Sequence, residues 1–236
     1  MIDRCGRNID YLRISVTDRC NLRCIYCMPE EGIRLTEREK ILQEPEIIRV
    51  CKVMAELGIT KIKITGGEPL VRSRIPELIY QIKEISGIEK VTLTTNGILL
   101  KGQMKALAES GLDSLNISLD TLDRECFCKI TRRDLLDGTL DGIKEAMKYP
   151  EVQLKINCVP LGLEFARKNP VHVRFIEMMP IGYGSSFAGM TQEKIMNLVE
   201  QKFGKMIPYN GKPLGNGPCT YYTVDGFEGK IGFISA

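Results

Sequence analysis

Three cysteines lie within eight residues of the chain, at Cys20, Cys24 and Cys27, in the pattern C-x3-C-x2-C. Thiolate sulfur is a soft ligand that suits iron–sulfur clusters. Three thiolates can hold three iron corners of a four-iron cluster, which leaves the fourth corner open to a small molecule. Disulfides between cysteines this close in sequence are unfavourable, because the bridge requires a geometry that such short spacing does not allow. The triplet therefore predicts an iron–sulfur cluster.

Two other interpretations of the triplet are less favoured. Structural zinc normally takes four Cys or His ligands, usually as two separated pairs. This chain has one triplet, no second C-x-x-C, and a single histidine, His172, far away in sequence. The other alternative is three incidental buried cysteines that behave as small hydrophobic residues. The polar sequence around the triplet and its specific spacing argue against that alternative.

The composition is that of a globular protein. The chain has 236 residues, of which 43% are hydrophobic, and this fits one large domain. No run of 18 apolar residues is present, and the N-terminal residues lead into no apolar signal core. Nine cysteines without a signal fit reduced thiols and a metal centre, so we expect a cytoplasmic protein. The net charge of +3 permits an anionic substrate, and neither nucleic acid nor a membrane is expected as a partner.

The elements that would position the cysteines alternate between strands and helices. Residues 11–17 alternate like a strand and run directly into the triplet. Further strands are expected at 59–65, 91–95, 115–119, 152–159 and 171–178, helices at 45–57, 75–85, 103–110, 135–149 and 191–203, and a hairpin at 219–225 and 229–234. Loops are expected at 28–42 and around Cys126 and Cys128. This alternation predicts parallel strands joined by right-handed crossovers.

The ends of the expected strands favour a barrel over a Rossmann sheet. Residues able to bind ligands lie at or just past the carboxyl ends of five strands: Cys20, Gly66-Gly67, Thr94-Thr95-Asn96, Ser118 and Met179. In a β/α barrel the catalytic loops collect at this one face. We therefore predict an α/β protein with a partial (β/α)6 TIM-type barrel in residues 1–207. Residues 208–236 would be a short hairpin extension. The connection 160–170 is short for a crossover with a full helix.

The triplet, with Tyr26 just before its last cysteine, is similar to the signature of radical S-adenosylmethionine (SAM) enzymes. In that superfamily the amino and carboxylate groups of SAM chelate the open iron of a [4Fe-4S] cluster. An electron from the cluster cleaves SAM to methionine and a 5'-deoxyadenosyl radical, which abstracts hydrogen from the substrate. Longer segments resemble the GTP 3',8-cyclase family of molybdenum cofactor biosynthesis, and together they span most of the chain: residues 11–29, 64–70, 93–97, 115–120 and 174–182.

The resemblance implies a lyase that converts GTP into (8S)-3',8-cyclo-7,8-dihydroguanosine 5'-triphosphate. In the family, hydrogen is taken from the ribose 3' carbon, and the resulting carbon radical adds to C8 of guanine. The implied cofactors are one [4Fe-4S] cluster held by this chain and SAM. The implied partners are GTP and an external electron donor, and a homodimer is one assembly to consider.

The resemblance also implies roles for individual residues. The cluster ligands, and with them the catalytic centre, would be Cys20, Cys24 and Cys27. The SAM contacts would be Tyr26, Gly67, Glu68, Ser118, Arg174 and Met179, and the GTP contacts would be Arg13, Lys63, Thr94 and Lys155. Lys63 stands where the family usually has arginine, and lysine lacks the bidentate fork that suits phosphate.

Several of these residues could have a purely structural role instead of binding a ligand. Gly66 to Pro69 could be an ordinary strand-to-helix turn. Lys63 and Lys155 could be exposed strand residues, the more usual place for a lysine. Met179 could be a core methionine, Arg174 could form an ion pair with Glu177, and His172 would be a surface or barrel-edge residue.

The largest departure from the family pattern concerns its second cysteine triplet, which holds another cluster that binds guanine. The family carries that triplet beyond the position of Ser235, whereas this sequence ends at Ala236. The remaining cysteines, among them Cys126, Cys128, Cys158 and Cys219, do not reproduce the pattern. The resemblance therefore implies that residues 208–236 are the remnant of a C-terminal substrate and second-cluster region. An alternative interpretation is therefore a truncated radical SAM homologue without the second cluster, either inactive or acting on another substrate such as a peptide.

Overall fold

The computed structural model of the chain describes residues 2, 6, 8–158, 167–168, 170–177, 190–214 and 219–234, without the side chain of residue 158. The chain divides into two compact units. The first unit comprises Met1–Asn21, Arg34–Asn116 and Asp137–Gln153, and the second comprises Leu22–Ile33, Ile117–Leu136 and Leu154–Ala236. The first unit is built from parallel strands with helices between them, and the second combines parallel strands with an antiparallel hairpin.

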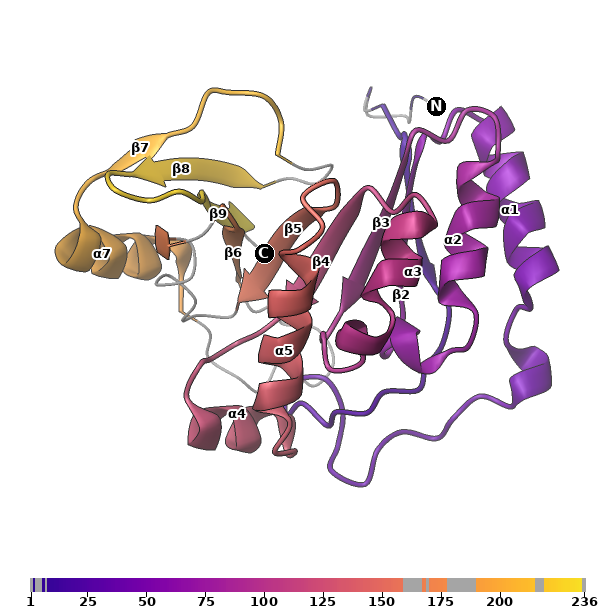
Figure 1. Cartoon of the computed structure of the whole chain (residues 1–236), viewed down its shortest axis with the longest axis horizontal. Coiled ribbons are helices and arrows are strands. Elements are labelled where there is room, and N and C mark those ends of the chain that lie inside the picture. The colour runs from indigo at the N-terminus through magenta and orange to yellow at the C-terminus, as the bar shows by residue number, and fades with distance from the viewer. Residues whose placement is uncertain are drawn as a thin grey trace. The chain divides into compact units, whose positions relative to one another are not determined.

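The first unit begins with three parallel strands, β1 (Tyr11–Ser15), β2 (Lys61–Thr65) and β3 (Lys90–Thr95). Helix α1 (Glu44–Glu56) connects β1 to β2, α2 (Ile75–Lys83) connects β2 to β3, and α3 (Met104–Glu109) follows β3. The three helices lie beside one another in chain order (Figure 1). Helix α5 (Leu136–Ala146) and three single 3-10 turns, η1 (Arg38–Lys40), η2 (Pro69–Val71) and η3 (Leu100–Gly102), complete the helical elements.

From β1 to β6, the strand order follows the order of the chain. Strand β4 (Ser114–Ser118) lies beside β3, where Asp113 N donates to Val91 O over 3.0 Å, and beside β5 (Gln153–Cys158), where Leu119 N donates to Asn157 O over 2.9 Å. Strand β6 (His172–Ile176) is parallel to β5, and the hydrogen-bonded order is β1-β2-β3-β4-β5-β6-β9-β8-β7. A Rossmann sheet would reverse its order at a switch point, whereas a β/α barrel keeps chain order. The partial barrel topology is therefore confirmed.

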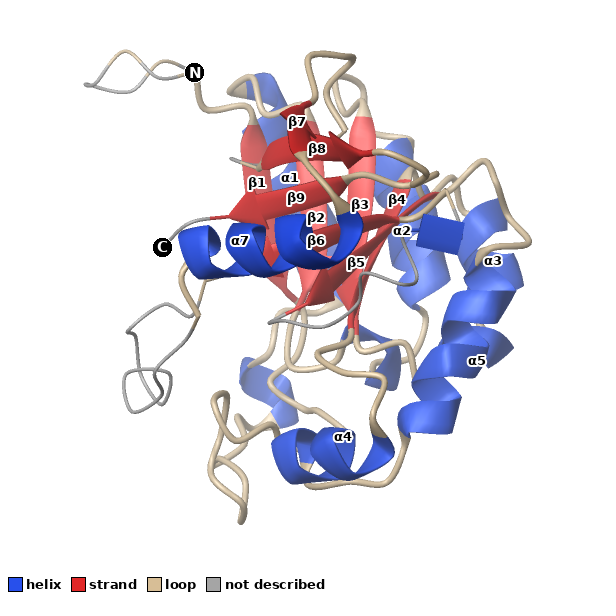
Figure 2. Cartoon of the chain, turned by 90° about the vertical axis from the view of Figure 1, so that its left-hand side faces the viewer, coloured by secondary structure: helices blue, strands red, loops and turns tan. Residues whose placement is uncertain are grey.

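The second unit ends in a hairpin that continues its sheet. Strand β9 (Ile231–Ile234) is parallel to β6, β8 (Thr220–Val224) is antiparallel to β9, and β7 (Met206–Pro208) is antiparallel to β8. Figure 2 shows these last three strands side by side. Helix α7 (Gln192–Phe203) begins at Thr191, whose side chain accepts a hydrogen bond from Lys194 N as expected for an N-cap. The predicted hairpin is confirmed, and the three-residue strand β7 was not expected.

The core of the first unit follows from the spacing of its apolar residues. In α2 the residues Ile75, Leu78, Ile79 and Ile82 are fully buried, at the i, i+3, i+4, i+7 positions of one helix face. In the strands, buried apolar residues alternate with polar ones, because successive side chains of a strand point to opposite faces. One face of the strands is therefore apolar, and the other carries the polar groups described below.

One local prediction was wrong. Cys126 and Cys128 lie in a helix, α4 (Arg124–Thr131), rather than in a loop. Asp123 caps its first turn, where Oδ1 accepts a hydrogen bond from Cys126 N over 2.8 Å. The helix buries only Phe127 and Thr131, so its apolar face is too narrow to show clearly in the sequence.

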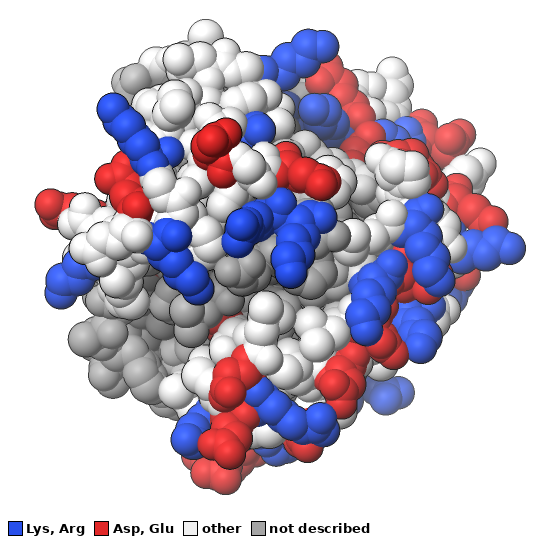
Figure 3. Space-filling model, turned by 60° about the vertical axis from the view of Figure 1, so that its left-hand side comes forward, with Lys and Arg blue, Asp and Glu red and all other residues white. Residues whose placement is uncertain are grey.

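The surface that the structure describes is polar and of mixed charge. Among the described residues, no helix has the length and apolar character needed to cross a membrane. Acidic and basic side chains lie next to one another on the face in Figure 3, in keeping with a formal net charge of +3.

Candidate active site

The cysteine loop, residues 16–33, follows β1 and carries all three cysteines of the triplet. Their thiols form no disulfide; Cys20 and Cys24 are half-buried and Cys27 is exposed. A turn at the end of the triplet is closed by Cys27 N, which donates to Cys24 O over 2.9 Å. The division between the units falls after Asn21. The first side of the loop, residues 16–21, therefore belongs to the first unit, and the second side, residues 22–33, belongs to the second unit.

The donor chemistry of this loop fits an iron–sulfur cluster, because it offers three unbridged thiols at the spacing of a cluster motif. Although the surface of Cys27 is exposed, partial desolvation raises the pKa of its thiol, so cluster binding must release the thiol proton. Across the described residues, no three Cys, His, Asp or Glu side chains are already placed around a common metal position. The cysteine triplet as the cluster site therefore stays a prediction, which the donor chemistry supports.

The first side of the loop is held by main-chain hydrogen bonds. Gly67 N donates to Thr17 O, and Glu68 N donates to Arg19 O, both over 2.7 Å. A Cβ atom on Gly66 would lie 2.6 Å from Thr17 O, and one on Gly67 would lie 2.4 Å from Arg19 O. Only glycine permits such a close approach of two backbones. The glycine pair thus has a packing role, and the predicted contact between Gly67 and SAM stays a prediction.

Glu68 fixes the ends of β2 and β3 relative to each other. Its side chain is 1% exposed. One carboxylate oxygen accepts hydrogen bonds from Leu70 N (3.0 Å) and Thr95 Oγ1 (2.7 Å), and the other accepts one from Asn96 N (2.7 Å). Asn96 Nδ2 in turn donates to Asn21 Oδ1 over 2.7 Å, next to the first cysteine of the triplet. Burial raises the pKa of Glu68 and the three donors oppose that rise. Its expected contact with the SAM ammonium stays a prediction.

The second side of the loop is attached to the end of α4. The backbone amides of Arg23 and Ile25 donate to the carbonyl oxygens of Thr131 and Ile130, over 3.0 and 2.9 Å. This short stretch of pairing precedes the turn that carries the second and third cysteines. The prediction of a loop around Cys126 and Cys128 therefore missed the helix that supports the triplet.

Arg132 joins both arms of this turn. It caps α4 in the left-handed region, with φ 55°, which directs its side chain away from the helix. Its Nη1 donates to Arg23 O over 3.1 Å and to Met28 O over 3.2 Å. Sequence reasoning missed this residue, because its partners lie more than 100 positions away and no motif marks it.

Tyr26, a predicted SAM contact, holds the loop through its hydroxyl group. Its Oη donates to Asp120 Oδ2 over 2.5 Å, and Asp120 lies two residues past the end of β4. Burial first, and then the charge of Asp120, raises the pKa of the tyrosine, so the hydroxyl keeps its proton and donates. Ser118, another predicted SAM contact, is the half-buried last residue of β4. Met179 lies outside the described residues.

Three of the four predicted GTP contacts share the polar face of the first unit. Arg13 on β1 and Lys63 on β2 are paired in register, and Lys63 is paired with Thr92 on β3. Thr94 lies two residues further along β3, which places it on the same face as Thr92. Its Oγ1 accepts a hydrogen bond from Asn116 Nδ2 over 3.2 Å. The structure therefore places two predicted cations and a predicted hydroxyl group on one face of the strands. Their contact with GTP stays a prediction.

The fourth predicted GTP contact, Lys155, lies on the polar face of the second unit together with Arg174. Lys155 is 3% exposed and Arg174 is 7% exposed, so an exposed strand lysine at position 155 is excluded. Lys155 is paired in register with His172, and Asn157 with Arg174. Arg174 Nη2 donates to Asn157 Oδ1. Two buried cations on adjacent strands favour an anionic ligand, because an anion offsets part of the cost of burying positive charge.

His172 is neutral at this face. It is half-buried, and its Nδ1 accepts a hydrogen bond from Lys230 N over 3.2 Å. Burial first, and then the charges of Lys155, Lys230 and Arg174, lowers its pKa to about 4. The structure thus places it on the barrel face beside the two buried cations.

Comparison with known proteins places the fold in one class. The Radical SAM superfamily model matches residues 14–162, which begin within β1 and include β2 to β5 and the cysteine loop. The crystal structure of Streptococcus suis SuiB bound to S-adenosylmethionine is similar, with a TM-score of 0.66 and 16% sequence identity. The similarity covers 96% of this chain and 50% of that chain, so this chain spans about half the length of that protein. The fold is that of radical SAM proteins.

The curated relatives narrow the class to one family. The chain is 47% identical over 247 residues to a GTP 3',8-cyclase of Clostridium perfringens (strain SM101 / Type A), covering 100% of this chain and 76% of the relative. It is 43% identical over 249 residues, with the same coverage, to a GTP 3',8-cyclase of Pelotomaculum thermopropionicum. The chain therefore belongs to the GTP 3',8-cyclase family of the radical SAM superfamily.

Proposed function

We propose that this protein is a GTP 3',8-cyclase that forms (8S)-3',8-cyclo-7,8-dihydroguanosine 5'-triphosphate in molybdenum cofactor biosynthesis. The observation that carries the proposal is the 47% identity to a GTP 3',8-cyclase across the whole chain. The cysteine loop at the carboxyl end of β1 supports it, since that is the end of the strands at which barrel enzymes place their catalytic loops.

In this proposal Cys20, Cys24 and Cys27 hold one [4Fe-4S] cluster. When bound, the cluster supplies the electron that cleaves SAM to methionine and a 5'-deoxyadenosyl radical. The contribution of the chain is positional, because the hydrogen bonds of Glu68 and Arg132 fix the two sides of the loop that presents the thiols. We assign the SAM contacts to the predicted set Tyr26, Gly67, Glu68, Ser118, Arg174 and Met179.

The substrate end of the site would be cationic. Arg13 and Lys63 on the first unit's polar face and Lys155 on the second unit's polar face would counter the triphosphate charge, with Thr94 supplying a hydroxyl group. The lysine ammonium of Lys63 offers a point charge rather than a fork, so it orients phosphate less strictly than arginine. Within this site the hydrogen atom of the ribose 3' carbon would pass to the 5'-deoxyadenosyl radical, and C3' would bond to C8 of guanine. One electron from the external donor and one proton would then complete the 7,8-dihydro product.

The remaining expectations are also proposals. We propose that an external donor supplies the electron, that the protein acts in the cytoplasm, and that the chain can form a homodimer. We also propose that residues 1–207 form the barrel domain and that residues 208–236 form a C-terminal extension.

The test is an anaerobic reaction of the reconstituted protein with SAM, dithionite and GTP carrying deuterium at C3'. We expect mass spectrometry to find cyclised GTP and deuterium in the 5'-deoxyadenosine. Unlabelled 5'-deoxyadenosine without cyclised GTP would contradict the proposed substrate.

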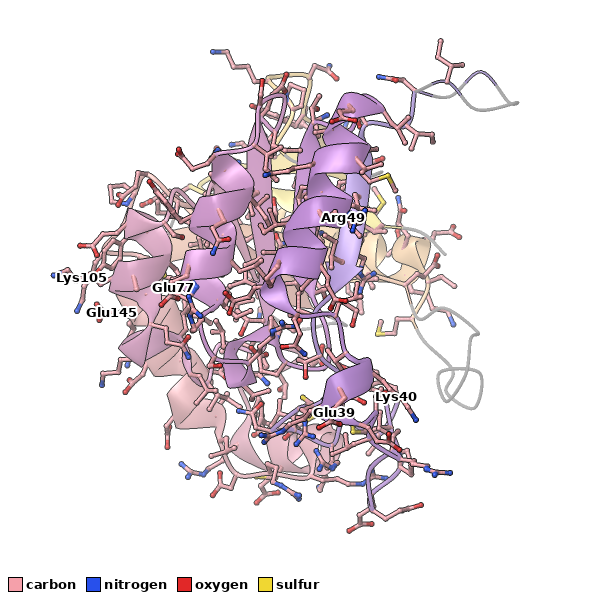
Figure 4. The ribbon with its side chains drawn as sticks, turned by 90° about the vertical axis from the view of Figure 1, so that its right-hand side faces the viewer. Glu39, Lys40, Arg49, Glu77, Lys105 and Glu145 are labelled. Atoms are coloured by element: carbon pink, nitrogen blue, oxygen red, sulfur yellow. The ribbon has the colours of Figure 1, made fainter. Side chains whose placement is uncertain are left out.

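A pair of lysine variants tests the substrate end of the site. Lys155→Gln should raise the KM for GTP, because it removes a buried cation. Lys105→Gln, on the outer side of α3 in Figure 4, should not change the KM. Equal KM values for the two variants would remove Lys155 from the proposed site.

A further inference from the structure

The first unit contains a cavity of about 370 Å³ that is lined by none of the predicted site residues. Its walls come from three segments, residues 16–19 of the cysteine loop, residues 38–43 before α1 and residues 71–73 after β2. The volume lies within the range of small-molecule sites, which begins at about 300 Å³.

The charged groups in the wall are all cationic. Arg19, Arg38 and Arg72 each come from a different one of the three segments, and no carboxylate lines the cavity. Thr17 and Ser73 add hydroxyl groups. Three guanidinium groups with two hydroxyl groups form a donor-rich wall, which suits an anion with several oxygen atoms.

Arg72 is fixed in position by the protein. Its Nη1 donates to Val16 O over 2.8 Å and its Nη2 donates to Leu42 O over 3.0 Å. These bonds connect all three segments around the cavity. The acceptors are neutral carbonyl groups, so they orient the guanidinium and leave its positive charge in place.

Two carboxylates close in sequence to the cavity wall are engaged with backbone amides. Asp18 Oδ2 accepts a hydrogen bond from Thr36 N over 2.5 Å, and Glu46 Oε2 accepts one from Gln43 N over 2.7 Å. Over the described ranges, no ion pair joins a carboxylate to Arg19 or Arg38.

We propose that this cavity binds the phosphate chain of a small molecule, either an inorganic diphosphate or a nucleotide. Guanidinium forks match phosphate oxygens in pairs, which lysine ammonium groups cannot do. The site is separate in its residues from the proposed GTP contacts Arg13, Lys63, Thr94 and Lys155. A bound phosphate chain would connect the entrance of the cysteine loop with the segments before α1 and after β2.

The experiment is calorimetric titration of the purified full chain with pyrophosphate, ADP and adenosine at low ionic strength. Arg38→Gln is the main variant, because its exposed side chain can change without opening the core. Arg19→Gln is the second. Arg49→Gln is the control, since Arg49 is also an exposed arginine but lies on α1 outside the cavity wall (Figure 4).

We expect pyrophosphate and ADP to bind the wild type and adenosine not to bind. Arg38→Gln and Arg19→Gln should each weaken binding by about tenfold, the loss of roughly one charge-assisted contact, and Arg49→Gln should not. Tighter binding of ADP than of pyrophosphate would assign the site to nucleotides, and the reverse order to the inorganic anion. Binding of adenosine alone, or equal effects of all three variants, would overturn the proposal.

Discussion

Main-chain hydrogen bonds hold both sides of the cysteine loop, but the two sides differ in their other contacts. On the first side, the backbones approach so closely that no Cβ atom fits at Gly66 or Gly67, and the buried carboxylate of Glu68 fixes the strand ends beside the loop. On the second side, the guanidinium of Arg132 and the hydroxyl of Tyr26 make long-range contacts. The comparison teaches that the first side is sensitive to added atoms and to loss of a buried acceptor, whereas the second side depends on specific side-chain donors.

The largest effect is expected from adding one carbon to the first side. Gly67→Ala places a Cβ 2.4 Å from Arg19 O, so the two backbones must separate. We expect the free energy of unfolding to fall by about 3 kcal/mol, measured by urea denaturation. Gly102→Ala is the matched control, because its Cβ would have no heavy atom within 4 Å. Equal stability of the two variants would contradict the close approach.

Removal of charge from Glu68 should have the next largest effect. In Glu68→Gln one oxygen becomes an amide group, which cannot accept the hydrogen bonds that the carboxylate accepts. A loss of about 2 kcal/mol in unfolding free energy is expected. Glu77→Gln, on α2 and labelled in Figure 4, removes an exposed carboxylate and should change stability by less than about 0.5 kcal/mol. If Glu68→Gln lowers the unfolding free energy no more than Glu77→Gln does, the hydrogen bonds of the Glu68 carboxylate do not stabilise the first side of the loop.

A smaller and more local effect is expected on the second side. Arg132→Gln removes the donors to Arg23 O and Met28 O and should cost about 1.5 kcal/mol. Hydrogen exchange should accelerate at Cys27 N and Met28 N but not at the strand amides of β2. The control is Lys129→Gln, an exposed residue of α4. Uniform acceleration across both sides would show that the two sides are not held independently.

A separate prediction concerns pH and does not involve the loop. The folded pKa of His172 is about 4, below its ordinary value of 6.5, so the folded state favours the neutral form. Its contribution to stability is complete above about pH 6.5 and is lost as the pH falls toward 4. The same fall in pH should change the stability of His172→Gln less, as measured by thermal unfolding. An unchanged pH dependence in that variant would assign the acid effect to other groups.

The sequence predicted those features that depend on the local spacing of residue types. The apolar spacing of α2 and the cap at Thr191 predicted the right helices, and the C-x3-C-x2-C spacing predicted the superfamily. Helix α4 was missed because it buries only two residues, and its paired cysteines suggested a loop.

Contacts between distant residues could not be predicted in this way. The bond between Tyr26 and Asp120 joins residues 94 positions apart, and no local pattern marks either partner. The burial of Lys155 likewise depends on the strands beside it, so the sequence could not distinguish a surface lysine from an inward one.

The most direct test of the account compares two cysteine variants after anaerobic reconstitution with iron and sulfide. The account predicts that wild type and Cys128→Ser each bind about four iron atoms and release 5'-deoxyadenosine from SAM. Cys24→Ser should lose both the cluster signal in electron paramagnetic resonance and the cleavage of SAM. Full iron content and SAM cleavage in Cys24→Ser would contradict the central claim that the cysteine loop holds the cluster.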